Sequence, residues 1–351
     1  MENNSLNAFA IYRLPQSTQI KWVNGFCMNQ LTPIDEIPDN SFVLSPFNNG
    51  NETYYFSFNQ SKEYDKASFE LPPLSPSINE ADFSTTGKES YVALINKAVN
   101  TLKNSASEFQ KIVLANTKTI PLSQFNPILF FEKLAQEYPN AFVYCAYTPV
   151  SGWWLGASPE TLITTQNNQF KSIALAGTLP PNAQRSFSQK EIDEQHWVEL
   201  YIEKQLIEES IPFQKEGPAP VQAGQLTHLQ TSYLFGSDQD EKRMFALLKK
   251  LNPTPAVAGL PKDKAINFIT ENEGITRSFY AGFIGTKQAK NLQLFVNLRC
   301  LHWHNKQITL FAGAGITADS NPESEWEETQ HKMNTLEKFL FIIFACGFIV
   351  L

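Results

Sequence analysis

Between residues 141 and 178, four short runs rich in β-branched and aromatic residues follow one another at close spacing. They are AFVYCAYT, WWLGAS, ETLITT and FKSIALAGT. Runs of this length and composition, separated by a few residues, are typical of consecutive strands joined by hairpins. The segment therefore predicts antiparallel pairing, and it does not fit a regular βαβ alternation.

The rest of the chain extends this pattern. Further strands are predicted at TYYFSF, FQKIVLAN, SFYAGFIG, LQLFVNLRCLHW and QITLFAG. Apolar periodicity and helix-start signals predict helices near residues 88–102, 127–138, 191–210, 239–251 and 262–271. This is an α+β pattern with mostly antiparallel strands.

LPPLSPS, residues 71–77, is the best candidate for a linker between parts of the chain. We therefore expect a strand-rich part at 1–75 within the same globular unit, a main domain at 85–338, and an apolar tail at 339–351.

Composition narrows the class of protein. The net charge is −7 and no Lys/Arg run occurs, which argues against nucleic acid as the main partner. Four cysteines without C-x-x-C spacing suggest reduced thiols and a cytoplasmic protein, and the N-terminus lacks the features of a signal peptide. The tail FLFIIFACGFIVL is short for a membrane span. We expect a buried terminal helix or strand, with a contact at a membrane surface as the alternative.

The segment SNPESEWEETQHK, residues 320–332, is dense in glutamate. Ser320 with Glu323 forms a potential capping box, and Pro322 fits the first turn of a helix. Acidic residues in a first turn also complement the helix dipole. On these grounds alone the cluster is an ordinary helix N-terminus.

Helical spacing points to a second role for part of this cluster. Glu325, Glu328, Lys332 and Leu336 fall on one stripe, and its lower part is apolar and faces the core. Buried carboxylates need a cation or strong hydrogen-bond donors. An all-oxygen ligand set suits a hard divalent ion such as Mg²⁺.

Three other side chains could carry chemistry. Lys111 shares a predicted strand face with apolar residues, and an amine that loses hydration there is a usable base; a solvated lysine on an edge strand is the alternative. Glu160 opens a predicted strand, where burial would make it a general acid, although a surface glutamate beside a turn also fits. Glu194 shares a helical stripe with Val198 and could face Glu325 across a metal, or act only as a dipole partner.

Residues that could bind an anion lie in the last third of the chain. Arg299 interrupts an apolar predicted strand, and an inward arginine needs a partner such as a carboxylate. Tyr280 lies in the strand-like SFYAGFIG, and the glycines of AGAGITA let backbone N–H groups approach an anion. His302 and His304 share a strand face but lack a third ligand, so an exposed hairpin end is favoured over a metal site. His228 on its own is an ordinary helix or loop histidine.

Taken together, the ordered motifs resemble the chorismate-binding family, which comprises isochorismate, salicylate, anthranilate and aminodeoxychorismate synthases. The resemblance covers about residues 88–338, and that range is then the chorismate-binding catalytic domain. It implies an α+β fold in which large antiparallel sheets pack as a sandwich with helices on the outside. The motifs are QKIVLAN, GASPETL, LAGT, the K-x-x-x-E of KEIDE, THLQTS, PTPAVAG-LPK, FYAGFIG, LR and AGAGI followed by S-x-P-x-x-E-W-x-E-T-x-x-K.

The resemblance also implies roles for individual residues. Glu194 and Glu325 would ligate Mg²⁺, with Glu328 nearby, and the metal would hold the ring carboxylate of chorismate. Lys111 would activate water, and Glu160 would protonate the departing 4-hydroxyl. The remaining substrate-binding positions are Tyr280, Arg299 and a glycine turn at Gly313 and Gly315 for the enolpyruvyl carboxylate, together with Lys332, His228, Gly177, Thr178 and Ala256.

Two positions indicate the product by the same resemblance. Ammonia-using members have Gln in place of Lys111, and several members that eliminate pyruvate have Thr in place of Ala256. We therefore expect an isochorismate synthase serving menaquinone or siderophore biosynthesis, with no glutaminase subunit and a monomeric state. Salicylate synthase and a non-catalytic chorismate-binding protein are the alternatives. The chain departs from the family pattern at Gln195, Asn252 and Ala258, which bears on rate and fine binding more than on reaction type.

Overall fold

The computed structural model describes residues 6–28, 30–48, 52–78, 83–104, 109–179, 186–223, 226–236, 241–289 and 291–346. Its helices are α1 (Lys88–Asn104), α2 (Pro127–Glu137), α3 (Gln189–Glu208), α4 (Glu241–Leu251), α5 (Lys262–Asn272) and α6 (Pro322–Cys346). Its strands are β1 (Leu6–Arg13), β2 (Ile20–Cys27), β3 (Thr32–Pro33), β4 (Ser41–Ser45), β5 (Glu52–Ser57), β6 (Lys62–Glu63), β7 (Lys111–Pro121), β8 (Phe142–Thr148), β9 (Gly152–Ser158), β10 (Thr161–Gln166), β11 (Gln169–Leu179), β12 (Phe213–Ala223), β13 (Leu226–Phe235), β14 (Gly259–Leu260), β15 (Phe283–Gln288), β16 (Asn291–Val296), β17 (Cys300–His304) and β18 (Gln307–Ile316).

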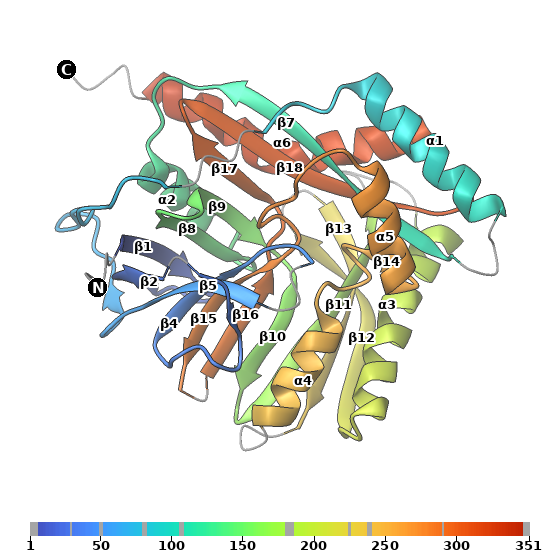
Figure 1. The fold of residues 1–351 in the computed structure, drawn as a ribbon, viewed down its shortest axis with the longest axis horizontal. Coiled ribbons are helices and arrows are strands. Elements are labelled where there is room, and N and C mark those ends of the chain that lie inside the picture. The colour runs from blue at the N-terminus through green and yellow to red at the C-terminus, as the bar shows by residue number, and fades with distance from the viewer. Residues whose placement is uncertain are drawn as a thin grey trace.

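The strands form one continuous series of antiparallel pairs. Starting at one edge, the order is β12, β13, β11, β10, β16, β15, β4, β5, β2, β1, β8, β9, β17, β18, β7 and β14. Figure 1 shows that this series curls, with helices on its outside. The predicted α+β fold with antiparallel strands is confirmed, and so are the hairpins β8–β9 and β10–β11. β9 and β10 do not pair with each other; they pair with β17 and β16 instead.

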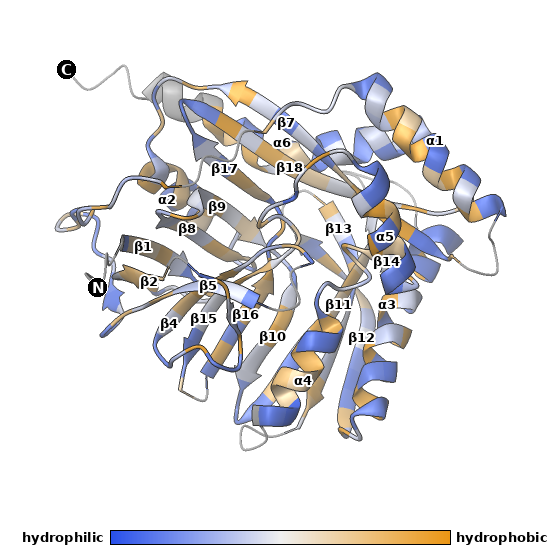
Figure 2. Ribbon diagram, viewed as in Figure 1, coloured by the Kyte–Doolittle hydropathy of each residue, from blue (hydrophilic) through white to orange (hydrophobic). Residues whose placement is uncertain are grey.

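The two arms of this curled sheet face each other across the main core. Phe142 of β8 stacks on Phe295 of β16 with ring centroids 4.3 Å apart, although several strands separate them in the pairing order. Stacked aromatic pairs stabilise a core beyond the area that they bury. Figure 2 shows helices such as α4 with hydrophobic residues on one side and hydrophilic residues on the other, as expected of helices that cover a core. The arrangement is a two-layer sandwich.

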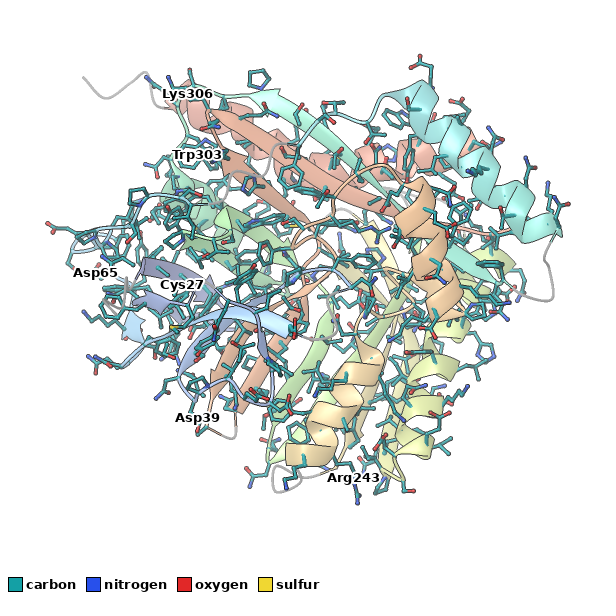
Figure 3. All side chains as sticks on the ribbon, viewed as in Figure 1. Cys27, Asp39, Asp65, Arg243, Trp303 and Lys306 are labelled. Atoms are coloured by element: carbon teal, nitrogen blue, oxygen red, sulfur yellow. The ribbon has the colours of Figure 1, made fainter. Side chains whose placement is uncertain are left out.

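The first strands belong to this same sheet. β1 lies between β2 and β8, and β4 pairs with β15 from the last third of the chain. Charged residues labelled in Figure 3, such as Asp39, Asp65 and Lys306, lie at the periphery of the molecule.

Helix α6 packs on β18 and carries the predicted inward stripe. Glu325, Met333 and Leu336 are buried, whereas Glu323 and Glu327 are exposed. The predicted cap at Ser320 is wrong: the side chain of Asn321 accepts from the Ser324 amide, and the Ser320 hydroxyl accepts from the Thr317 amide. Asn at this position satisfies an amide of the first turn equally well.

The apolar tail begins as the last part of α6. Phe339 and Leu340 are buried, and residues 347–351 lie outside the described residues. Among the residues that the structure describes, no helix is long and apolar enough to cross a membrane.

Four local predictions for the last third of the chain are wrong. The segment around His228 is strand β13, not helix or loop. LFVNLRCLHW is not one strand but β16 and β17, with Arg299 at the break in a left-handed conformation (φ 47°). Tyr280 lies in a turn before β15. Gly313 and Gly315 lie within β18 and do not form a turn.

Candidate active site

Strands β7 and β18 form the floor of the candidate site. Lys111 is the first residue of β7, is 3% exposed, and lies beside Gly315 of β18. A Cβ atom on Gly315 would lie 2.4 Å from Cε and 3.0 Å from Nζ of Lys111. The end of the Lys111 side chain would have to move to admit such an atom, so glycine at this position leaves room for the amine where it lies. The Lys111 amine is buried, as predicted, in the space that Gly315 leaves beside it.

Glu160 lies immediately before β10 and is 2% exposed. Its Oε1 accepts a hydrogen bond from the Thr254 hydroxyl at 3.2 Å. Burial raises the pKa of the Glu160 carboxyl to about 8, and the Thr254 hydrogen bond and the Lys111 charge offset only part of this effect. The group is therefore mostly protonated at neutral pH, as a general acid must be.

Three glutamates from two helices converge at one side of the site, and each pairs with a lysine. The Glu194 carboxylate on α3 lies 3.8 Å from the Lys111 amine, and Glu328 lies 2.6 Å from Lys332. Glu325 accepts a hydrogen bond from Lys190, whose amine is also 3.9 Å from Glu194. Glu194 and Glu325 thus share one cationic partner.

The electrostatics of these carboxyls follow from their surroundings. Burial raises the pKa of Glu194 and of Glu325, the nearby lysines lower both, and the neighbouring carboxylates raise them further. Burial also raises the pKa of Glu328, but Lys332 outweighs it and the net pKa is lowered. A cluster that holds ionised carboxylates this close needs cations to compensate them.

The donor set fits a hard divalent ion. All three side chains are carboxylates, and Glu194 and Glu325 both lie within ion-pair distance of the Lys190 amine. Within the described ranges, no three His, Cys, Asp or Glu side chains are arranged as a ready metal site. The assignment of Mg²⁺ to Glu194, Glu325 and Glu328 therefore stays a prediction.

A second group of residues, predicted to bind an anion, surrounds His228. The Arg299 guanidinium lies 3.2 Å from Nε2 of His228, and the Thr178 hydroxyl lies 3.2 Å from Nδ1 of the same ring. Burial lowers the pKa of His228 well below its usual range, and the positive charges of Arg299 and Lys332 lower it further. Since Arg299 can only donate, Nε2 of the neutral ring accepts and Nδ1 carries the proton.

Tyr280 and Lys332 converge on Gly313 of β18. A Cβ on Gly313 would lie 2.8 Å from the Tyr280 hydroxyl, and the Lys332 amine donates to the Gly313 carbonyl at 2.7 Å. The two glycines of AGAG are therefore explained by the side chains that cross the strand. Tyr280 itself stacks on Phe311 with centroids 5.5 Å apart, which fixes its ring.

Gly177 forms a bulge in β11 beneath the start of α3. Its φ is +63°, and a Cβ there would lie 2.6 Å from the Glu191 carbonyl oxygen, so only glycine fits. The neighbouring Gln195, one of the departures from the family pattern, is buried. Its side chain accepts from the Ala176 amide and donates to the Thr231 hydroxyl. Gln195 therefore ties α3 to β11 at the edge of the site.

One cavity of about 80 Å³ collects the predicted residues. Its lining includes every residue predicted to be catalytic or substrate-binding: Lys111, Glu160, Gly177, Thr178, His228, Ala256, Tyr280, Arg299, Gly313, Gly315 and Lys332. Glu194 and Glu328 also line it, whereas Glu325 and Lys190, which contact each other, are not among its lining residues. A larger cavity of about 710 Å³ adjoins this one and shares Arg299, but it contains none of the acid, base or acidic-cluster residues.

Sequence reasoning missed Lys190, which belongs to the K-x-x-x-E motif but received no role. A lysine at the second position of a helix, where the dipole disfavours positive charge, was the available signal.

The expectation of an exposed hairpin end at His302 is wrong, because His302 is 3% exposed and packs against Phe83 and Trp154.

The family model described as "Chorismate binding enzyme" matches residues 50–341. The salicylate biosynthesis isochorismate synthase of Pseudomonas aeruginosa is 29% identical over 290 residues, which cover 77% of this chain and 59% of that protein. The vibriobactin-specific isochorismate synthase of Vibrio cholerae is 30% identical over 267 residues, covering 72% of this chain and 67% of that protein.

A solved structure shares the fold. The menaquinone-specific isochorismate synthase of Escherichia coli superposes with a TM-score of 0.76 at 22% identity, covering 97% of this chain and 90% of that chain. At this identity the likeness concerns the fold. The matched segment spans a little over half the length of several curated relatives, such as the one from Pseudomonas aeruginosa.

Proposed function

Because the chain belongs to the family of chorismate-binding enzymes, we propose that it is an isochorismate synthase that converts chorismate to isochorismate. The observation that carries the proposal is that Lys111 and the protonated Glu160 line one cavity. A base and an acid in one small site suit a reaction that adds water at one ring carbon and removes a hydroxyl at another. We further propose that the enzyme works in the cytoplasm, where its buried thiols Cys27, Cys145 and Cys300 stay reduced.

Lys111 and Glu160 each carry out one proton transfer. Lys111 takes a proton from a water molecule, whose oxygen forms a bond to C2 of the ring. The ring double bonds shift as the C4–O bond breaks, and Glu160 gives its proton to the departing hydroxyl, which leaves as water. One water enters and one leaves, so substrate and product are isomers. Gly315 holds open the space in which the Lys111 amine lies.

The remaining residues bind and orient the substrate. Arg299, steadied by neutral His228, pairs with the enolpyruvyl carboxylate, and the Tyr280 hydroxyl lies beside it over Gly313. Glu194 and Glu325, with Glu328 next to them, would hold Mg²⁺, which supplies the positive charge for the ring carboxylate. Fixing both carboxylates positions C2 and C4 between the base and the acid.

Ala256 supports release of isochorismate without loss of pyruvate. It lines the cavity with a methyl group and offers no hydroxyl to the substrate. Salicylate synthase, the alternative, would carry the same site on to pyruvate elimination. The isochorismate formed would serve menaquinone or siderophore biosynthesis.

The test is chromatography of chorismate incubated with purified enzyme and Mg²⁺, without ammonia or glutamine, beside an assay for pyruvate. The proposal expects isochorismate and no pyruvate, and it expects no isochorismate from Lys111→Ala. Stoichiometric pyruvate would establish the salicylate synthase reaction instead. Calorimetric binding of chorismate without turnover would make the protein a non-catalytic binder.

A further inference from the structure

Lys190 occupies a position that local helix energetics does not explain. It is the second residue of α3, whose start is formed by Ser188 and Glu191 in a capping box. A positive charge at a helix N-terminus is disfavoured by the dipole. The pair with Glu194 is also the weaker order for an i, i+4 ion pair, since the lysine precedes the glutamate. The reason for a lysine here must therefore lie in tertiary contacts.

Those contacts join the two helices that carry the acidic cluster. The Lys190 amine donates to Glu325 of α6, and it lies 3.9 Å from Glu194 of α3. The Glu325 side chain is only 3% exposed, and the Glu194 side chain is 12% exposed. Two carboxylates held at this depth repel each other unless a cation lies between them. Lys190 supplies that cation from within the chain.

The lysines near the acidic cluster balance most of its charge. Glu194, Glu325 and Glu328 contribute three negative charges. Lys190 and Lys332 contribute two positive charges, and Lys111 carries no charge when it acts as the base. A divalent cation added with Lys190 still in place would leave an excess of positive charge. If the cation displaces Lys190, the charges cancel instead.

Lys190 also has a way out of the site. Its side chain is 33% exposed, in contrast to Lys111 at 4%. A long, flexible lysine stem can move its charged end into water at little cost. The Lys190 side chain can thus place its ammonium either against Glu194 and Glu325 or in solvent.

We propose that Lys190 is an internal counter-ion that holds the place of the divalent cation between Glu194 and Glu325, and leaves that place when the cation and the dianionic substrate bind together. This inference rests on the proposed function, because it takes chorismate as the dianion. It makes cation and substrate binding mutually dependent, because the substrate carboxylate is a further ligand of the cation that displaces Lys190.

The first test follows Lys190 directly by brief acetylation and mass spectrometry. The protein used is Glu160→Gln, which retains the acidic cluster but does not turn chorismate over. We expect acetylation of Lys190 to rise severalfold with Mg²⁺ and chorismate together, and much less with Mg²⁺ alone. Lys88, an exposed lysine paired with Glu323 at the start of α6, is the internal control and should not change. Unchanged or reduced acetylation of Lys190 would overturn the proposal.

The second test measures binding of Mn²⁺ by electron paramagnetic resonance in the absence of substrate. Lys190→Met should bind Mn²⁺ on the order of tenfold more tightly than the parent, the size typical of coupling between sites. The matched control Lys88→Met removes the lysine at the start of α1 that pairs with Glu323 of α6, without touching Glu325 or Glu194, and should bind as the parent does. Equal or weaker binding of Mn²⁺ by Lys190→Met would show that Lys190 does not compete with the cation for the position between Glu194 and Glu325.

The two tests separate this inference from the proposed function. If Mn²⁺ binds and Glu325→Gln abolishes the binding while Lys190 stays unreactive, the metal site stands and the counter-ion role fails. If Mn²⁺ does not bind in either background, with or without chorismate, the metal assignment itself fails. Folding of each variant is checked by its circular dichroism spectrum.

Discussion

Replacing Glu160 by Gln should abolish activity and stabilise the protein at neutral pH. The folded carboxyl has a pKa of about 8 because it is buried, whereas an exposed glutamate has a pKa of 4.5. Between these values the folded state keeps a proton that the unfolded state has lost. The free energy of unfolding therefore falls as pH rises from 4.5 to 8 and levels off above 8. Gln mimics the protonated acid, and its oxygen can still accept from Thr254. The free energy of unfolding of the variant therefore lacks this fall between pH 4.5 and pH 8.

The size of the effect follows from the separation of the two pKa values. Each pH unit is worth about 1.4 kcal/mol, so the wild-type protein carries a penalty of about 3 kcal/mol at pH 7 and almost none at pH 4.5. Urea unfolding of both proteins from pH 5 to pH 8 measures the difference. Glu327→Gln, which alters an exposed carboxylate on the outer side of α6, is the control. A difference between wild type and Glu160→Gln that does not grow with pH would refute the buried-acid argument.

The remaining predictions concern turnover and ligands. In the pH profile, kcat should fall above pH 8, where Glu160 loses the proton that it must donate, and a profile still rising beyond pH 9 would exclude Glu160 as the acid. Gly315→Ala should lower kcat at least about a hundredfold, because its methyl group would occupy space taken by the Lys111 amine, and unchanged kcat would show that the amine can move aside harmlessly. Chelation with EDTA should abolish turnover and added Mg²⁺ should restore it, whereas full activity in EDTA would argue against a metal at Glu194 and Glu325.

The strands could be predicted because their signals are local: alternating runs at hairpin spacing predicted β8 to β11. The local sequence left the burial of Lys111 and Glu160 open, and the family resemblance assigned their roles as base and acid. The inward stripe of α6 was also readable, because helical periodicity separates Glu325 from Glu323. Such predictions need only the chain around each residue.

The errors arise where distant segments decide the local structure. Gly313 and Gly315 suggested a turn, yet both lie in strand β18. Glycine occurs at these two positions because the side chains of Tyr280 and Lys111 cross the strand and fill the space of a side chain. Arg299 takes a positive φ, where one apolar run breaks into two strands. Strand β13 buries the polar side chains of His228 and Thr231 as well as apolar ones, and it lies between its partners β11 and β12. No local pattern reports these constraints.

The role of Lys190 belongs to the same class. Its partner Glu325 is more than a hundred residues away in the chain, and only the fold brings α3 and α6 together. The sequence offered one indirect signal, a lysine where the helix dipole disfavours it. The same fold places the buried acid and the buried amine in one cavity.

The central claim is that this pair directs water to one carbon of the ring while a hydroxyl leaves another. Turnover of chorismate in water enriched in ¹⁸O, followed by mass spectrometry of the product, tests it most directly. The account predicts isochorismate whose new C2 hydroxyl carries solvent oxygen. Isochorismate that retains only the original oxygen of the 4-hydroxyl, or no isochorismate at all, would contradict it.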